Sequence, residues 1–212
     1  MTESYPPPLQ PEFFRRADES ADPGFYEQPR LVTHIDDAAI AALTAFYGEM
    51  LSGRAAVLDL MSSWVSHLPA DAKLERVAGL GMNAAELDAN PRLTERVVQD
   101  LNADPRLPFR DDSFDAAIVS VSVQYLVRPV EVFAETGRVL RPRAPFAVAY
   151  SNRMFPTKAV AIWQQLGDLE RADLIGLYFR LAGAFDEVRA YNISPGPGSD
   201  PMFVVVGHAT GT

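Results

Sequence analysis

The stretch that decides the fold is Val57-Leu58-Asp59-Leu60-Met61-Ser62-Ser63-Trp64. Its first four residues form an apolar run around an acid, and a tight turn follows at once. In an α/β domain, a buried strand leads in this way into the loop that opens a ligand crevice. Glycines usually build that loop, and here serines and Trp64 stand in their place. The stretch therefore indicates the fold more clearly than the reaction.

Length and composition fit one soluble domain. The chain has 212 residues, of which 48% are hydrophobic and 22% charged, so it can bury a sizeable core. The net charge of −9 argues against nucleic acid as a partner, because a phosphate backbone is bound by clustered lysine and arginine. There is no cysteine, which excludes disulfides, thiolate nucleophiles and cysteine-ligated metals.

Neither a targeting signal nor a membrane span is evident in the sequence. The stretch from Met1 to Pro8 lacks the basic and apolar regions of a secretory signal. No apolar run approaches the roughly 18–20 residues that cross a bilayer. We therefore expect a cytoplasmic enzyme or binding protein without a membrane partner.

Residues 1–35 are predicted to form an arm, or lid, over an α/β domain of residues 36–212. The arm is rich in proline and charge, yet four aromatic residues lie between Phe13 and Tyr26. A free tail rarely carries so many rings, so we expect the arm to pack over the core. Asp36 then caps a helix whose apolar residues recur at three- and four-residue steps as far as Met50.

Short apolar runs alternate with helical segments in the rest of the chain. Several runs are apolar without alternation, as expected for parallel strands covered on both faces. The predicted parallel strands are Ala55–Leu60, Glu75–Leu80, Glu95–Asp100, Phe114–Ser122 and Phe146–Tyr150. The predicted helices are Asn83–Ala89, Pro129–Leu140, Thr157–Leu166 and Leu169–Leu181. A loop too short for a crossover helix joins Glu187–Ile193 to Met202–Ala209, so these strands must be antiparallel. The pattern is that of one doubly wound domain.

Ligands of an open parallel sheet lie beyond the carboxyl ends of its strands. The residues placed there offer short polar side chains and backbone amides but only two carboxylates, Asp59 and Asp100. That set suits an amino acid, ribose or adenine better than a polyphosphate, and no P-loop is present. The three histidines, His34, His67 and His208, lack the spacing of a metal site, so we predict no metal.

Four segments, in order, carry a resemblance to a known family: Val57–Leu60, Val77–Asn83, Gln99–Asp115 and Arg138–Pro142. They resemble the class I S-adenosylmethionine-dependent methyltransferases, particularly the type 11 branch. The resemblance implies a Rossmann-like, mostly parallel seven-stranded sheet with an antiparallel terminal strand, S-adenosylmethionine as cofactor and S-adenosylhomocysteine as product. The cofactor-binding residues that it implies are Asp59, Met61, Ser62, Ser63, Gly81, Met82, Asn83, Asp100, Leu101, Asn102 and Ser120.

The chain departs from the family pattern in two places. The family's first loop is glycine-rich, so that the backbone can approach the methionine part of the cofactor, whereas here residues 61–65 are Met-Ser-Ser-Trp-Val. The family also places a carboxylate at the end of the second strand to accept both ribose hydroxyls, and here Gly81 stands there. Without that acceptor, cofactor binding is expected to weaken by ~1–3 kcal/mol unless Asn83 or Glu86 replaces it.

Three residues of the arm are candidates for chemistry. Arg30 is predicted to pair with a carboxylate, while His34 or Tyr26 takes a proton from the acceptor. A second interpretation of His34, that it helps to cap the following helix, stays open. His67 is interpreted as lying in the first turn of a short helix, and Trp64 as filling the core.

The ends of the fourth and fifth strands complete the predicted site. Tyr125 is the third candidate catalytic residue, and Gln124, polar in an apolar stretch, is predicted to contact substrate; the alternative is that both form hydrogen bonds within the end of the sheet. Asn152 and Arg153 are predicted to reach the substrate from the rim, with a solvated turn as the alternative. The apolar stripe from Ile162 to Phe179 is typical of a core or of a homodimer surface.

The leading hypothesis is methyl transfer from S-adenosylmethionine to a small-molecule acceptor. The protein then needs only to align two reactants and remove at most one proton, so no strong catalytic motif is required. A second hypothesis is a methyltransferase-like domain that has lost catalysis and serves as a binding or scaffold module. A third keeps the cofactor but uses its positive charge in a reaction other than methylation.

Overall fold

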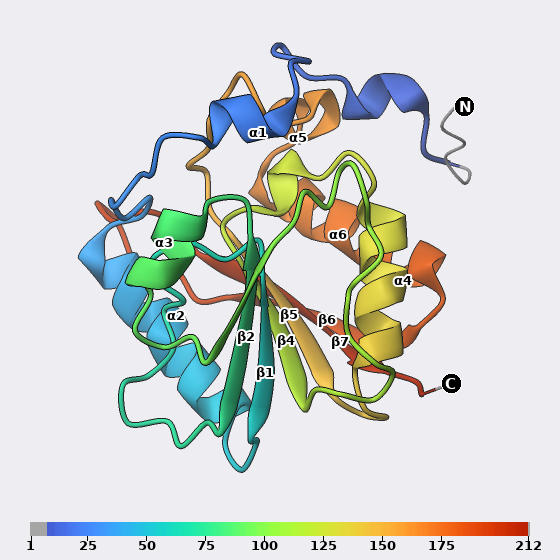
Figure 1. Ribbon diagram of the computed structural model, residues 1–212. Helices are drawn as coiled ribbons and strands as arrows, with labels where there is room; N and C mark the ends of the chain where they lie inside the picture. The colour runs from blue at the N-terminus through green and yellow to red at the C-terminus, as the bar shows by residue number, and fades with distance from the viewer. Residues whose placement is uncertain (1–7, 212) are drawn as a thin grey trace.

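The first four residues of the stretch Val57–Trp64 lie in strand β1 (Ala56–Leu60), near the middle of a seven-stranded sheet. The structure, a computed structural model, describes residues 8–211. The strand order is β3-β2-β1-β4-β5-β7-β6, and β7 runs antiparallel to both of its neighbours (Figure 1). The predicted fold class, a Rossmann-like sheet with strands β1 to β5 parallel, is confirmed.

Every predicted strand is present, with small shifts at the ends. The remaining strands are β2 (Arg76–Gly81), β3 (Glu95–Val98), β4 (Ala116–Ser120), β5 (Pro145–Tyr150), β6 (Phe185–Asn192) and β7 (Phe203–Ala209). Strand β4 ends earlier than predicted because Val121 has a φ of 46°, which a strand does not allow. Strand β3 likewise ends at Val98, before the predicted Asp100.

Two helices cover each face of the sheet (Figure 1). Helices α2 (Asp37–Met50) and α3 (Ala84–Ala89) lie on one face, and α4 (Pro129–Val139) and α6 (Asp168–Ala182) lie on the other. The predicted cap of α2 is confirmed, because the carboxylate of Asp36 accepts a hydrogen bond from the amide of Ala39. The helix predicted over 157–166 is only α5 (Ala161–Gln165), since the turn before it binds the arm through the Thr157 carbonyl.

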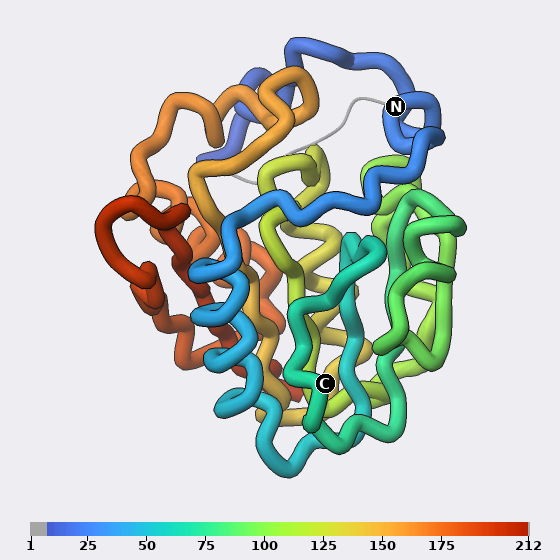
Figure 2. The backbone as a smooth tube through the Cα atoms, turned by 90° about the vertical axis from the view of Figure 1, so that its left-hand side faces the viewer, coloured from blue at the N-terminus to red at the C-terminus, as the bar shows by residue number. Residues whose placement is uncertain are grey.

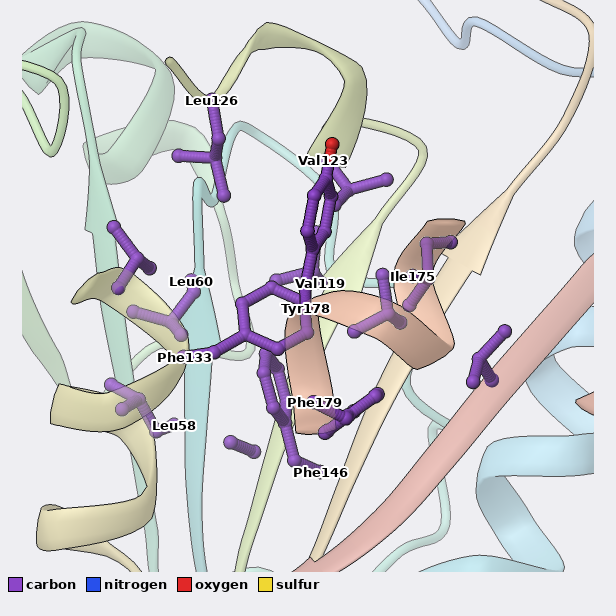
Figure 3. Packing of buried hydrophobic residues seen from close by; sticks show 14 of the residues in the cluster. Leu58, Leu60, Val119, Val123, Leu126, Phe133, Phe146, Ile175, Tyr178 and Phe179 are labelled. Atoms are coloured by element: carbon purple, nitrogen blue, oxygen red, sulfur yellow. The ribbon is translucent and has the colours of Figure 1, made fainter. Parts of the chain in front are cut away.

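The core explains the unbroken apolar runs of the sequence. Successive residues of a strand point to opposite faces, and both faces of this sheet are covered. Leu58 and Leu60 pack with Phe133, Phe146 and Phe179 on the α4/α6 face (Figure 3). Val57 joins Leu43 and Tyr47 on the α2/α3 face.

The connection from β1 to β2, residues 61–75, contains no helix. The short helix expected around His67 is therefore wrong. His67 has a φ of 53°, a left-handed conformation that interrupts a right-handed helix. Pro69, two residues on, also lacks the amide that a helix would need. No helix N-terminus consequently faces the crevice from this loop.

Residues 8–35 run along the carboxyl ends of the strands as an irregular segment (Figure 2). This segment contains two short helical turns, η1 (Pro11–Phe14) and α1 (Asp22–Phe25). A further short turn, η2 (Val123–Tyr125), follows β4. Residues 1–7 of the predicted arm, on which the prediction about a secretory signal rests, lie outside the described residues. No helix within residues 8–211 is both long and apolar enough to cross a bilayer.

Candidate functional site

A cavity of about 540 Å³ lies at the carboxyl ends of the strands, between the sheet and the arm. Its size falls within the range of small-molecule sites. All but two of the residues predicted for the site line it. They are Tyr26, Arg30, His34, Met61, Ser62, Ser63, Gly81, Met82, Asn83, Asp100, Leu101, Asn102, Ser120, Tyr125, Asn152 and Arg153. The two that do not line it are Asp59 and Gln124.

Asp59 lies behind the first loop rather than in the main cavity. It is only 2% exposed, and its Oδ2 accepts hydrogen bonds from the hydroxyls of Ser62 (2.6 Å) and Ser66 (2.5 Å). Burial raises the pKa of Asp59 to about 7, although both hydroxyls oppose the rise. Here Asp59 organises the loop that faces the cavity.

The first loop closes directly onto strand β2. The Ser62 amide donates to the Leu80 carbonyl at 2.8 Å, and Met61 before it adopts a φ of 54°. A Cβ added at Gly81 would lie 2.1 Å from the Ser62 carbonyl oxygen, closer than real contacts allow. Gly81 is therefore required by the packing of the loop. The glycine-poor loop and the missing acid, which look like two separate departures in the sequence, are one structural feature.

Helix α3 joins the first loop to the arm through Asn83 and Glu86. Asn83 caps the helix, with its Oδ1 accepting from the Glu86 amide at 3.1 Å. Its Nδ2 donates to the carbonyls of Tyr26 and Glu27 in the arm. Glu86, which sequence analysis names only as a possible replacement acid, lines the cavity at 8% exposure.

The segment after β3 supplies a carboxylate, an apolar surface and an amide. Asp100 is half-buried, and its Oδ1 accepts from the amides of Asn102 and Ala103. Leu101 is 4% exposed and belongs to the main core cluster. The Asn102 side chain is fully engaged, donating to Asp22 and to the Tyr125 carbonyl and accepting from the Val127 amide.

The arm is fixed over this edge by a buried ion cluster that sequence analysis missed. Lys158, whose side chain is 0% exposed, lies 3.1 Å from the carboxylate of Asp18 and 3.2 Å from that of Asp22. Arg16 also pairs with Asp22 at 2.7 Å. Burial raises the pKa of Asp22, but hydrogen bonds from Arg16 and Asn102 outweigh it and lower the pKa overall.

The turn after β4 holds Tyr125 and Gln124 by different contacts. The hydroxyl of Tyr125 accepts from the Phe155 amide at 2.8 Å, and the two rings stack at 5.9 Å. Gln124 points away from the cavity and donates to the carbonyls of Val121 and Arg153. Ser120, at the end of the strand, shares a 2.9 Å hydrogen bond with the buried hydroxyl of Tyr47.

Tyr26, Arg30 and His34 lie together on the arm. The Arg30 guanidinium lies over the rings of Phe25 (4.5 Å) and Phe155 (5.3 Å), and its Nη2 donates to the Phe25 carbonyl. Burial lowers the pKa of His34; the charge of Glu86 opposes this effect, and the charge of Arg30 adds to it. Burial raises the pKa of Tyr26 well above its usual value.

The remaining candidates lie at the rim or in a second space. Asn152 is exposed, and Arg153, also exposed, pairs with Asp200 at 3.4 Å. Trp64 does not line the main cavity; its indole donates to the Val32 carbonyl and so holds the arm. It borders a small cavity of about 40 Å³ together with His67, whose pKa burial lowers to about 4. Within residues 8–211 no cluster of acidic residues and histidines has the arrangement of a metal site.

The sequence was compared with known protein families and with curated proteins. Residues 62–148 match the family model described as a methyltransferase domain. No curated protein matches the chain. The match confirms, over residues 62–148, the resemblance inferred from the sequence.

Solved structures share the fold at low sequence identity. A [4+2]-cyclase, SpnF, is 15% identical with a TM-score of 0.61, covering 89% of this chain and 92% of its own. A SAM-dependent methyltransferase from Archaeoglobus fulgidus is 12% identical with a TM-score of 0.61 and covers 80% and 92%. Geranyl diphosphate C-methyltransferase from Streptomyces coelicolor A3(2), a complex with S-adenosyl-L-homocysteine, is 14% identical with a TM-score of 0.55 and covers 88% and 89%.

Proposed function

We propose that the protein transfers a methyl group from S-adenosylmethionine to a small-molecule acceptor. The observation that carries the proposal is the cavity of about 540 Å³, which most of the residues predicted for cofactor, acceptor and proton removal line. The net charge of −9 and the covering arm favour a metabolite over nucleic acid as the acceptor. We place this activity in the cytoplasm.

The residues around the cavity fit a nucleoside cofactor along β2 and β3. Leu80, Met82 and Leu101 give an apolar wall, and Asp100 keeps its Oδ2 without a partner among residues 8–211. That oxygen would accept from the exocyclic amine of adenine. The acceptor would lie toward β4 and β5, beside Tyr125, Arg30 and the rim residue Asn152.

When bound, the cofactor would supply a methyl group attached to a positively charged sulfur. A lone pair of the acceptor would attack the methyl carbon and displace that sulfur. The protein's part is to align the two molecules and to accept one proton. His34 is the best acceptor of that proton, because burial lowers its pKa and keeps its imidazole neutral near pH 7. Tyr26 and Tyr125, whose pKa values burial raises, stay protonated and orient the acceptor by hydrogen bonding.

Calorimetric titration with S-adenosylhomocysteine tests the proposal. We expect micromolar binding that weakens by roughly tenfold in Asp100→Ala, the loss typical of a hydrogen bond to a charged group. Asp71→Ala, a carboxylate removed from an exposed loop away from the cavity, is the matched control. Absence of binding to the wild-type protein would refute the proposal and favour a binding or scaffold module. Binding without any methylated product from a metabolite pool would favour a reaction other than methylation.

A further inference from the structure

Glu86 is a buried carboxylate at the cavity wall. It is 8% exposed and forms no ion pair with a side chain of residues 8–211. Each of its oxygens accepts one hydrogen bond, Oε1 from the Arg30 amide at 2.7 Å and Oε2 from the Ser63 hydroxyl at 2.6 Å. An ionised carboxylate offers about four lone-pair sites, so acceptor capacity remains.

Neither Gly81 nor Asn83 offers a side-chain donor to the remaining acceptor sites of Glu86. Gly81 has no side chain and has no room for one against the Ser62 carbonyl. Asn83 uses its oxygen to cap α3 and both amide hydrogens to hold the arm. Glu86 lies in the first turn of α3, which follows β2 closely, and it lines the same cavity as Gly81.

We propose that Glu86 accepts hydrogen bonds from a vicinal diol, the ribose hydroxyls of the bound nucleoside. The inference rests on the proposed function and deepens it by assigning the residue that recognises the sugar. Two adjacent hydroxyls supply two donors, which match the spare acceptor sites of one carboxylate. The same oxygens accept hydrogen bonds from the Ser63 hydroxyl and the Arg30 amide. The Glu86 side chain would therefore contact the sugar, the first loop and the arm at once.

The geometry also predicts that the arm senses the ligand. The Arg30 amide is part of the arm, and its hydrogen bond to Glu86 shares the oxygens that the diol would use. A nucleoside with its diol is therefore expected to protect the Arg30 amide from hydrogen exchange. A nucleoside without the diol is expected to protect that amide less.

The test compares ligands with and without the diol on matched variants. S-adenosylhomocysteine, adenosine and 2′,3′-dideoxyadenosine are titrated into the wild-type protein, Glu86→Gln and Glu75→Gln. Glutamine keeps the shape and one acceptor oxygen, and Glu75 is an exposed glutamate away from the cavity. We expect Glu86→Gln to weaken adenosine and S-adenosylhomocysteine by about 10- to 100-fold. Dideoxyadenosine is expected to bind wild type and Glu86→Gln equally, and Glu75→Gln is expected to behave as wild type.

The outcomes separate the inference from the proposed function. If wild type binds S-adenosylhomocysteine but Glu86→Gln binds it equally well, the assignment of Glu86 is wrong and the proposed function stands. Equal weakening of adenosine and dideoxyadenosine would show a merely structural role and would also overturn the assignment. If wild type binds neither S-adenosylhomocysteine nor adenosine, the proposed function itself fails.

Discussion

The Gly81→Ala substitution tests whether the first loop is closed onto strand β2. An alanine Cβ would lie 2.1 Å from the Ser62 carbonyl oxygen, 3.1 Å from its carbon and 3.2 Å from Leu87 Cδ2. Two of these three atoms belong to the backbone, so a side-chain rotation does not relieve the clash. The loop must move away, and the hydrogen bond from the Ser62 amide to the Leu80 carbonyl is lost.

The magnitude follows from these contacts. Overpacking of a rigid site costs about 1–3 kcal/mol, and the lost hydrogen bond adds roughly 0.5–1.5 kcal/mol. We therefore expect the free energy of unfolding to fall by about 2–4 kcal/mol. For a chain of this length that corresponds to a Tm lower by roughly 5–15 °C.

Urea unfolding monitored by circular dichroism measures the effect. Gly24→Ala is the matched control, because its Cβ would meet nothing within 4 Å, and we expect it to unfold like wild type. Equal stability of Gly81→Ala and wild type would refute the closed loop. Gly81 and the serine loop would then be two separate features.

Three further perturbations test other parts of the structure. The pKa of Asp59 is raised from 3.8 to about 7 in the folded state, so its contribution to stability is complete below pH 3.8 and is lost as the pH rises through 7. Asp59→Asn is expected to reduce this loss of stability with rising pH, and Tm values from pH 4 to 8 measure it. Lys158→Met leaves Asp18 and Asp22 without their shared cation, so trypsin is expected to cleave the arm at Arg30 several-fold faster than in wild type, and equal rates would contradict the anchoring role. Trp64→Phe removes the hydrogen bond to the Val32 carbonyl but leaves the main cavity intact, so S-adenosylhomocysteine affinity is expected to change less than threefold, and a larger loss by calorimetry would place the indole at the ligand.

The fold could be predicted from local patterns because its strands are buried on both faces. Runs such as Val57–Leu60 are apolar without alternation, and Asp36 and Asn83 stand at helix starts with capping geometry. The missing helix between β1 and β2 was harder to foresee. It depends on the left-handed backbone of Met61 and His67, which residues of those types rarely adopt.

The site could be located from strand ends but not resolved into roles. The carboxyl ends of parallel strands meet at one edge, so the residues that follow them line one cavity. Nothing in the sequence singles out Lys158, because its burial depends on where the distant arm lies. Gly81 stands in the sequence where the family has an acid, and the reason, the Ser62 carbonyl that leaves no room for a side chain, is visible only in the structure.

A crystal structure of the protein soaked with S-adenosylhomocysteine tests the central claim most directly. We expect the nucleoside in the main cavity, with adenine beside Leu101 and Asp100 and the ribose within hydrogen-bonding distance of Glu86, while the first loop keeps its contact with Gly81. Ligand density elsewhere, or a first loop displaced from β2 to admit the nucleoside, would contradict it.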